Sequence, residues 1–391
     1  MKKALSINTG TALLLSDHSD AFSGYDSISI NTGTALISKA IHKKLESLGA
    51  TINSGSTNVI EISGEIVELG VGTIITADSS YPSCYLVCTG KLIVEDAAGL
   101  DRITGLYAGA IYHPESVDLG AIKNITAERR IAYRDDAKLH LGNMALDGDS
   151  VITLEASPYH VSGTITALDG DVLEKLMSKK MSFACKKLII YVGLYEKYKD
   201  MFASDGFTFI PDGHAVVDDI TLDAATAALY GDKLYAHGDF TVHHDQVQYL
   251  DGFSSIVVKG KAIMPTSVAA AFRACGGKAD NFSLYKGTLM KIDGSATISR
   301  QQLQTATQKG ISYWIVLNGS LDFDTDVTAD DIDAIAGIHC NGSIEAPGSA
   351  RAALIAKIKE MNGSIDDIES SKDKAQSDEI VNSINTGIYR L

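Results

Sequence analysis

Two histidines and two aspartates stand at alternate positions of a short segment: His237, Asp239, His243 and Asp245. If this segment is one unbroken strand, the four side chains share a face, because successive side chains alternate between the two faces. Imidazole and carboxylate groups on one face could bind Zn²⁺ or a similar ion. The alternative is a polar, solvent-facing strand surface, since side chains two positions apart lie about 7 Å apart and metal ligands usually converge from several segments.

An acidic run offers a second candidate ion site, made of Asp322, Asp324 and Asp326. Their spacing by two residues is similar to that of a calcium-binding loop. The position that requires glycine in such a loop holds Val327, and the position that requires glutamate holds Asp333. The alternative is an N-terminal helix cap with a solvated turn.

Motifs of enzyme active sites are missing from the sequence. We find neither the Gly-x-Ser-x-Gly turn of a serine hydrolase nor a Gly-rich phosphate loop followed by Lys-Ser or Lys-Thr. We therefore expect no enzyme and no cofactor. A carbohydrate-active enzyme with its acids on successive strands remains a third alternative among the functions considered below.

One pentapeptide, Ser-Ile-Asn-Thr-Gly, occurs at residues 6–10, 29–33 and 383–387. A related tripeptide, Asn-Gly-Ser followed by Leu or Ile, begins at Asn318, Asn341 and Asn362. In both sequence variants of the repeat, a stretch with alternating apolar residues ends in a polar residue and a glycine. The pattern is typical of an internal repeat whose units each contain a short strand.

The spacing of these units predicts a repeat solenoid. Their glycines recur mostly about 20 to 30 residues apart, which is a solenoid repeat length. Each unit joins a strand to a turn, and many add a short helix, so the units should stack into a parallel β-sheet. We expect an α/β solenoid or β-helix-like fold that runs as one continuous domain over residues 1–391.

The two ends of this solenoid have distinct features. Residues 1–55 hold the N-terminal repeats and an amphipathic helix at residues 34–48, which Gly49 can cap. Residues 369–391 hold a polar segment and the last repeat strand.

The units resemble leucine-rich repeats in their strand-plus-helix build and in an asparagine followed closely by Leu or Ile, at Asn318, Asn341 and Asn362. They depart from that family in the spacing after the asparagine, one residue longer, and in lacking the regular leucine ladder before it. The glycine-punctuated strands also resemble polymer-forming bacterial β-solenoids of the bactofilin type, whose coils are shorter and free of helices. The resemblance implies an architecture and leaves the function open.

Composition limits the partners of the chain. Its 34 basic and 49 acidic residues give a net charge of −15, and phosphate backbones repel such a surface, so we expect no nucleic acid partner. No apolar run approaches the roughly 20 residues of a membrane span. Five cysteines without a Cys-x-x-Cys pair favour a reducing cytoplasm. Asn8 interrupts the apolar stretch that a signal peptide would need. The alternative to a cytoplasmic location is export by an unrecognised route.

The repeated pentapeptide at both ends leads to a hypothesis about function. Solenoids usually protect their ends with atypical caps, because an open sheet end exposes unpaired backbone groups. Here both ends read as ordinary repeat strands, so they could stack head to tail into a filament of identical copies. The residues proposed for this contact are Ser6, Ile7, Asn8, Thr9 and Gly10, and Ser383, Ile384, Asn385, Thr386 and Gly387. The alternative is a module that binds another protein or a glycan on one solenoid face.

Overall fold

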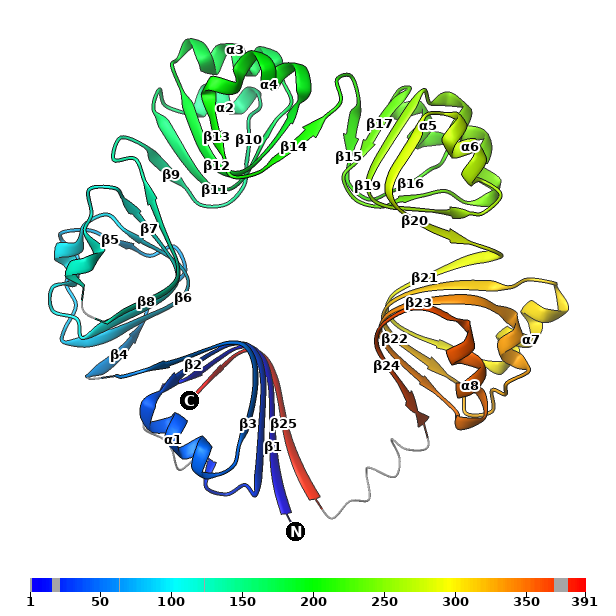
Figure 1. The fold of residues 1–391 in the computed structure, drawn as a ribbon, viewed down its shortest axis with the longest axis horizontal. Coiled ribbons are helices and arrows are strands. Elements are labelled where there is room, and N and C mark those ends of the chain that lie inside the picture. Colours follow the sequence, from blue (N-terminus) through cyan, green and yellow to red (C-terminus); the bar gives the residue numbers. More distant parts are fainter. Residues whose placement is uncertain (1, 16–21, 63, 123, 369–378) are drawn as a thin grey trace. The chain divides into compact units, whose positions relative to one another are not determined.

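The computed structural model describes residues 2–15, 22–62, 64–122, 124–368 and 379–391. The chain divides into two compact units, unit 1 with Met1–Phe209 and Asp378–Leu391, and unit 2 with Ile210–Ser377. Strands carry most of the regular structure of the described residues, and they form five sheets, with short helices between many of the strands (Figure 1). We call these sheets A to E in chain order.

Sheet A of unit 1 joins the two ends of the chain. Its strand order is β25–β1–β2–β3, all parallel. The elements are β1 (Lys2–Leu14), β2 (Ser27–Ser38), α1 (Lys39–Ser47), β3 (Thr51–Ile60) and β25 (Glu379–Arg390). Alternate residues of the strands turn inward, so that Ile7 and Ile30 are fully buried, and α1 adds Ile41 and Leu45 to the same core.

Sheets B and C complete unit 1. Sheet B contains β4 (Glu65–Glu68), β5 (Ile74–Ile75), β6 (Cys84–Val94), β7 (Gly105–Pro114) and β8 (Ile125–Tyr133). Sheet C contains β9 (Lys138–His140), β10 (Met144–Ala145), β11 (Pro158–Ala167), β12 (Ser182–Tyr191), β13 (Phe202–Ser204) and β14 (Phe207–Ile210). Helices α2 (Gly148–Thr153), α3 (Gly170–Ser178) and α4 (Val192–Tyr198) belong to the segment of sheet C. Several short strands share a neighbour; β4 and β5, for example, both pair with β6.

Sheets D and E make up unit 2. Sheet D contains β15 (Ala215–Val217), β16 (Ile220–Thr221), β17 (Lys233–Ala236), β18 (Phe240–Thr241), β19 (Ser255–Pro265) and β20 (Gly277–Tyr285). Sheet E contains β21 (Thr288–Ile298), β22 (Tyr313–Phe323), β23 (Ile335–Ala346) and β24 (Ile358–Asp367) in sequential order. The helices are α5 (Ala224–Leu229), α6 (Ala269–Ala274), α7 (Arg300–Gln308) and α8 (Gly348–Lys357).

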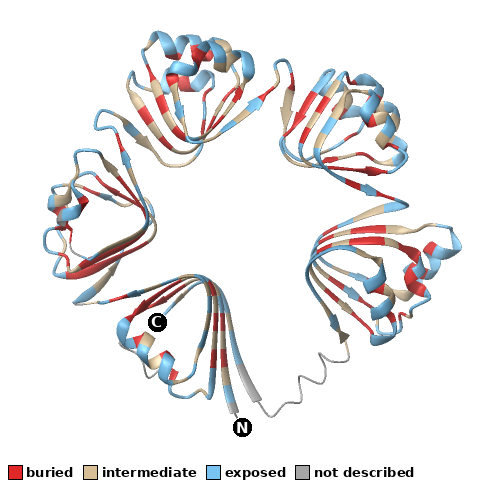
Figure 2. Cartoon of the chain, viewed as in Figure 1, coloured by how far each residue is buried: buried red, intermediate tan, exposed pale blue. Residues whose placement is uncertain are grey.

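Each sheet has its own apolar core, which lies between the strands and the helices or loops that cover one face (Figure 2). In sheet E, for example, Leu303 of α7 and Leu354 of α8 pack in one cluster with Ile315 and Ile338 of the strands. Smaller apolar clusters join neighbouring sheets within a unit, such as Ile263, Tyr285 and Trp314 between sheets D and E.

The expectation of stacked parallel strands with short helices is confirmed by these sheets. The continuous solenoid over residues 1–391 stays a prediction. The N-terminal helix differs from the one expected at residues 34–48, because it begins only at Lys39. The reason is strand pairing: Thr34, Ala35 and Leu36 continue β2 and pair in register with Thr11, Ala12 and Leu13 of β1.

The strand expected near the C-terminus is present as β25, whereas most of the polar segment, residues 369–378, lies outside the described residues. All five cysteines are free thiols. Within the described ranges, we find no helix that has both the length and the apolar character needed to cross a membrane.

Candidate functional site

A row of four asparagines runs across sheet A, one on each strand, and we call it the asparagine ladder. Its members are Asn385 of β25, Asn8 of β1, Asn31 of β2 and Asn53 of β3. In three of them Nδ2 donates to the Oδ1 of the neighbour on the side of β25, at 2.9 Å from Asn8 to Asn385 and at 2.8 Å from Asn31 to Asn8 and from Asn53 to Asn31. Stacked identical amides of this kind add to the stability of parallel, in-register sheets.

The ladder brings together the residues proposed for assembly. Ser6 to Thr9 of β1 pair position by position with Ser383 to Thr386 of β25, so the two terminal copies of the pentapeptide are neighbours within one chain. The third copy, at residues 29–33, continues the same register on β2. The identity of the copies predicts that they occupy equivalent positions; the structure adds that they stack directly on one another.

The Asn-Gly-Ser copies of the repeat also align in register, on neighbouring strands of sheet E. Asn318, Asn341 and Asn362 occupy one row together with Asp293 of β21. Asn318 Nδ2 donates to Asp293 Oδ1 at 2.8 Å, and Asn362 Nδ2 donates to Asn341 Oδ1 at 3.0 Å. In both of these bonds the later strand donates to the earlier one, as in the steps from β2 to β1 and from β3 to β2 of sheet A.

The histidine and aspartate run at residues 237–245 is not the single strand that was expected. His237 follows the end of β17, β18 contains only Phe240 and Thr241, and His243 precedes the 3₁₀ helix His244–Gly252. Asp239 lies in the turn between β17 and β18, where its Oδ1 accepts the backbone N–H of Lys261 at 2.7 Å. The turn therefore breaks the alternation that would have placed His237, Asp239, His243 and Asp245 on one face.

The acidic run is divided between a strand and a turn. Asp322 belongs to β22, whereas Asp324 and Asp326 follow the end of that strand, and the Asp324 carbonyl accepts the N–H of Val327 at 3.1 Å. Within the described ranges no group of three or more His, Cys, Asp and Glu side chains could hold a metal ion. The downstream Asp331 accepts hydrogen bonds from the Thr328 backbone N–H and hydroxyl, whereas Asp330, the N-cap residue of the 3₁₀ helix Asp331–Ala334, makes no side-chain capping bond.

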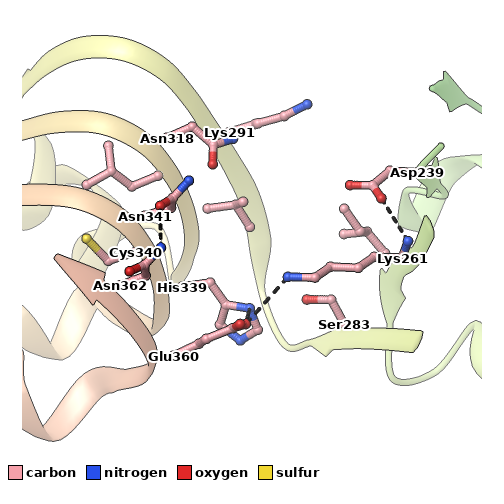
Figure 3. A pocket seen from close by; sticks show the side chains of 13 residues that line it. Asp239, Lys261, Ser283, Lys291, Asn318, His339, Cys340, Asn341, Glu360 and Asn362 are labelled. Carbon is pink, nitrogen blue, oxygen red and sulfur yellow. Dashed lines mark hydrogen bonds and ion pairs between the residues drawn. The ribbon is translucent and has the colours of Figure 1, made fainter. Parts of the chain in front are cut away.

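A cleft of about 330 Å³ lies between sheets D and E of unit 2. Lys261 of β19 and Ser283 of β20 line one side, and His339 of β23 and Glu360 of β24 line the other. Figure 3 shows the Lys261 side chain extending across the cleft toward Glu360, with Asn341 and the other amides of sheet E beside it. The volume is at the lower end of the roughly 300 to 1,000 Å³ that ligand sites occupy.

Glu360 connects the charged groups of this cleft. Its Oε2 lies 3.5 Å from Lys261 Nζ and 3.4 Å from His339 Nδ1. Burial lowers the pKa of His339, and the Glu360 carboxylate opposes that shift without reversing it. This shift favours the neutral form of His339, and its ring packs against the Trp314 indole with 5.2 Å between the centroids.

A second cleft, of about 440 Å³, has a related construction between sheets B and C of unit 1. His160 lines it and packs against Tyr112 and Tyr133, with ring centroids 6.2 and 5.8 Å apart. Burial lowers the pKa of His160 as well. A half-buried histidine against aromatic rings thus recurs where the strands of neighbouring sheets diverge within a unit.

Four of the cleft residues were not found as a site from the sequence, whereas Asp239 and the asparagines of sheet E were singled out for other reasons. Lys261, Ser283, His339 and Glu360 come from four strands, and no two of them belong to one motif. His339 stands alone in the sequence, and a single histidine carries no spacing signal. Comparison with known proteins adds no further assignment, since no family model, curated protein or solved structure matches the chain.

Proposed function

We propose that this protein is a structural solenoid that assembles with further copies of itself through the two edges of sheet A. The observation that carries the proposal is the polarity of the asparagine ladder. Among the strands that the structure describes, none follows the Nδ2 donor of Asn385 at the β25 edge, and none follows the Oδ1 acceptor of Asn53 at the β3 edge. The two edges of one sheet are therefore complementary to each other.

The register supports the same contact. If β25 of one molecule lies on β3 of another, Asn385 faces Asn53, Ile384 faces Ile52 and Gly387 faces Gly55, as at each step inside the sheet. Edge strands expose unpaired N–H and C=O groups, which a further parallel strand would satisfy. Such a contact joins two different surfaces and does not close on itself, so it builds a filament.

The composition of the edge supports assembly as well. Proteins usually protect edge strands with charged residues, especially lysine, or with proline. β3 has the sequence TINSGSTNVI and contains neither a charged residue nor a proline in its ten positions. The β3 edge of sheet A therefore lacks the side chains that normally prevent strand addition.

The pairing of the two terminal copies changes where the contact must lie. Assembly was expected between the N-terminal copy of one molecule and the C-terminal copy of the next, yet these copies pair within one chain. Deleting β25 is consequently a poor test, because it exposes β1, which carries the same pentapeptide. A substitution that changes the edge without removing the strand is more informative.

The test compares Asn385→Asp with Asn53→Asp. In the first variant the new carboxylate still accepts the Asn8 amide inside the sheet, but it stands where the edge donor was. We expect edge association to weaken about tenfold or more, the equivalent of one lost hydrogen bond. The second variant keeps the outward acceptor and loses only the internal bond to Asn31, so association should persist.

Sedimentation velocity and electron microscopy over a range of protein and salt concentrations would measure the association. A wild-type protein that stays a dispersed monomer under all conditions contradicts the proposal, as does equal association of wild type and Asn385→Asp. Thermal unfolding of both variants controls for loss of the fold.

A second candidate function, a module that binds a glycan or another protein, is favoured by one specific observation. The cleft of unit 2 contains a buried hydroxyl group, that of Ser283, with no hydrogen-bond partner among the described residues.

A further inference from the structure

Ser283 is an unusual residue for its position in the fold. It lies on β20 with 4% of its surface exposed, and its Oγ has no hydrogen-bond partner in the part of the chain that the structure describes. Buried hydroxyl groups are nearly always hydrogen-bonded, because leaving one unpaired costs free energy. Figure 3 shows this hydroxyl directed into the cleft between sheets D and E, on the side opposite His339 and Glu360. A ligand in the cleft would supply the missing partner.

Most of the charges that line the cleft are paired. Lys261 is paired with Glu360, at 3.5 Å, and Lys291 is paired with Asp293, at 3.6 Å. Asp239, the remaining charged lining residue, accepts the backbone N–H of Lys261 at 2.7 Å through its Oδ1. An anionic ligand would have to compete with these carboxylates, and a cationic ligand with the lysines. A neutral ligand can bind while both ion pairs stay in place.

The uncharged groups of the cleft favour a ligand that both donates and accepts hydrogen bonds. Asn318, Asn341 and Asn362 present amides, each of which has donors and an acceptor. These groups stand beside an apolar surface formed by Ile263 and Val316. Ligand sites combine apolar walls with a few placed polar groups in this way.

From these features we propose that the cleft of unit 2 binds a neutral sugar. The Ser283 hydroxyl, the Glu360 carboxylate and the Asn341 amide take its hydroxyl groups, and Ile263 and Val316 contact its apolar C–H face. Vicinal hydroxyls match this lining, because each can donate to a carboxylate or amide oxygen while it accepts from an amide N–H. The site does not depend on edge assembly, which uses residues of unit 1.

The chain contains one tryptophan, Trp314, and this makes the test direct. Its indole packs on His339, a lining residue, so intrinsic fluorescence reports on the occupancy of the cleft. The full-length protein is titrated with a panel of neutral sugars: glucose, galactose, mannose, N-acetylglucosamine and the disaccharides of each. Sodium phosphate and calcium chloride are titrated in parallel.

We expect at least one neutral sugar to change the Trp314 fluorescence with saturation. Ser283→Ala and Glu360→Gln should each weaken that sugar about tenfold or more, since each removes a hydrogen bond or charge-assisted contact. Glu345→Gln is the matched control, because Glu345 lies on β23 outside the cleft lining. It should bind as the wild type does, and Asn385→Asp should as well.

Three results would overturn the inference. The first is a panel in which no neutral sugar binds, and the second is saturable binding of phosphate or Ca²⁺ in place of sugar. The third is unchanged sugar affinity in both cleft variants when their unfolding temperatures show that they are folded.

Discussion

Gly342 of β23 is a position where a single added methyl group should destabilise unit 2. Its φ is +146°, in a region that residues with a side chain rarely adopt. A Cβ atom at this position would overlap the carbonyl oxygen of Gly319 on the neighbouring strand. Gly294 occupies the same row on the edge strand β21, with φ +105°, yet a Cβ there meets nothing within 4 Å.

This pair of glycines separates backbone strain from close strand packing. Forcing alanine into a positive φ costs about 1–3 kcal/mol, and the reduced freedom of the unfolded chain returns about 0.4–1 kcal/mol. Both terms apply to Gly294→Ala and Gly342→Ala alike and largely cancel in their difference. Gly342→Ala also forces β22 and β23 apart, and overpacking of this kind costs about 1–3 kcal/mol. We therefore expect Gly342→Ala to be less stable than Gly294→Ala by about 1–3 kcal/mol.

Urea unfolding followed by Trp314 fluorescence measures this difference, because Trp314 lies on β22 within the same sheet. The loss is a large part of the roughly 5–15 kcal/mol that stabilise a domain. Equal free energies of unfolding for the two variants, within about 0.5 kcal/mol, would refute the close stacking of the glycine row in sheet E.

Two further predictions concern titrating groups. Burial acts to raise the pKa of Asp331, but hydrogen bonds from Thr328 and the charge of Arg300 outweigh it and lower the pKa. Because the folded-state pKa lies below that of the unfolded chain, the stability it contributes is present above about pH 4 and lost in more acidic solution. Asp331→Asn should lower the free energy of unfolding at pH 7 by about 1–3 kcal/mol. Between pH 7 and about pH 3 this variant should lose less stability than the wild type, which urea unfolding at both pH values would measure. An unchanged pH dependence of stability contradicts the assignment. Burial raises the pKa of every cysteine thiol, so the native protein should react with a thiol reagent about tenfold or more slowly than the unfolded protein, and equal rates would refute this. The thiols are Cys84, Cys88, Cys185, Cys275 and Cys340.

Sequence identity between repeat copies was enough to predict which residues are equivalent. Asn8, Asn31 and Asn385 share one row of sheet A because identical neighbours on both sides of each asparagine favour an in-register parallel pairing. Asn53 joins the same row although its unit reads Thr-Ile-Asn-Ser-Gly, which keeps the apolar and glycine positions and changes only the polar ones.

Periodicity was less reliable where two patterns fit one segment. Residues 34–48 contain a helical apolar face, yet residues 34–36 are also a copy of the strand segment that follows Gly10, and strand pairing prevails there. The alternation at residues 237–245 predicts a strand, but Gly238 and Asp239 form a turn. The side chain of Asp239 accepts a hydrogen bond from the Lys261 backbone N–H on β19, which is a contact that no local pattern reveals.

The cleft could not have been predicted by any local reading. Ser283 is one of many serines in the sequence, and its significance depends on its burial and on the missing partner of its hydroxyl, which no local sequence pattern reveals. Glu360 likewise reads as an ordinary exposed residue until Lys261 and His339 approach it from other strands.

The edge strands of sheets A and E differ in the charges that they carry, and charged edge strands resist the addition of a further strand. In sheet E the edge strand β24 carries Lys359, Glu360, Asp366 and Asp367, so strand addition there would bring charges together. The β3 edge of sheet A has no such charges, and a second copy is opposed there by the long-range repulsion of a chain with a net charge of −15. Salt screens that repulsion over about 10 Å at 0.1 M and leaves the short hydrogen bonds of the ladder intact. Association through sheet A should therefore strengthen as salt is added, whereas association through ion pairs would weaken.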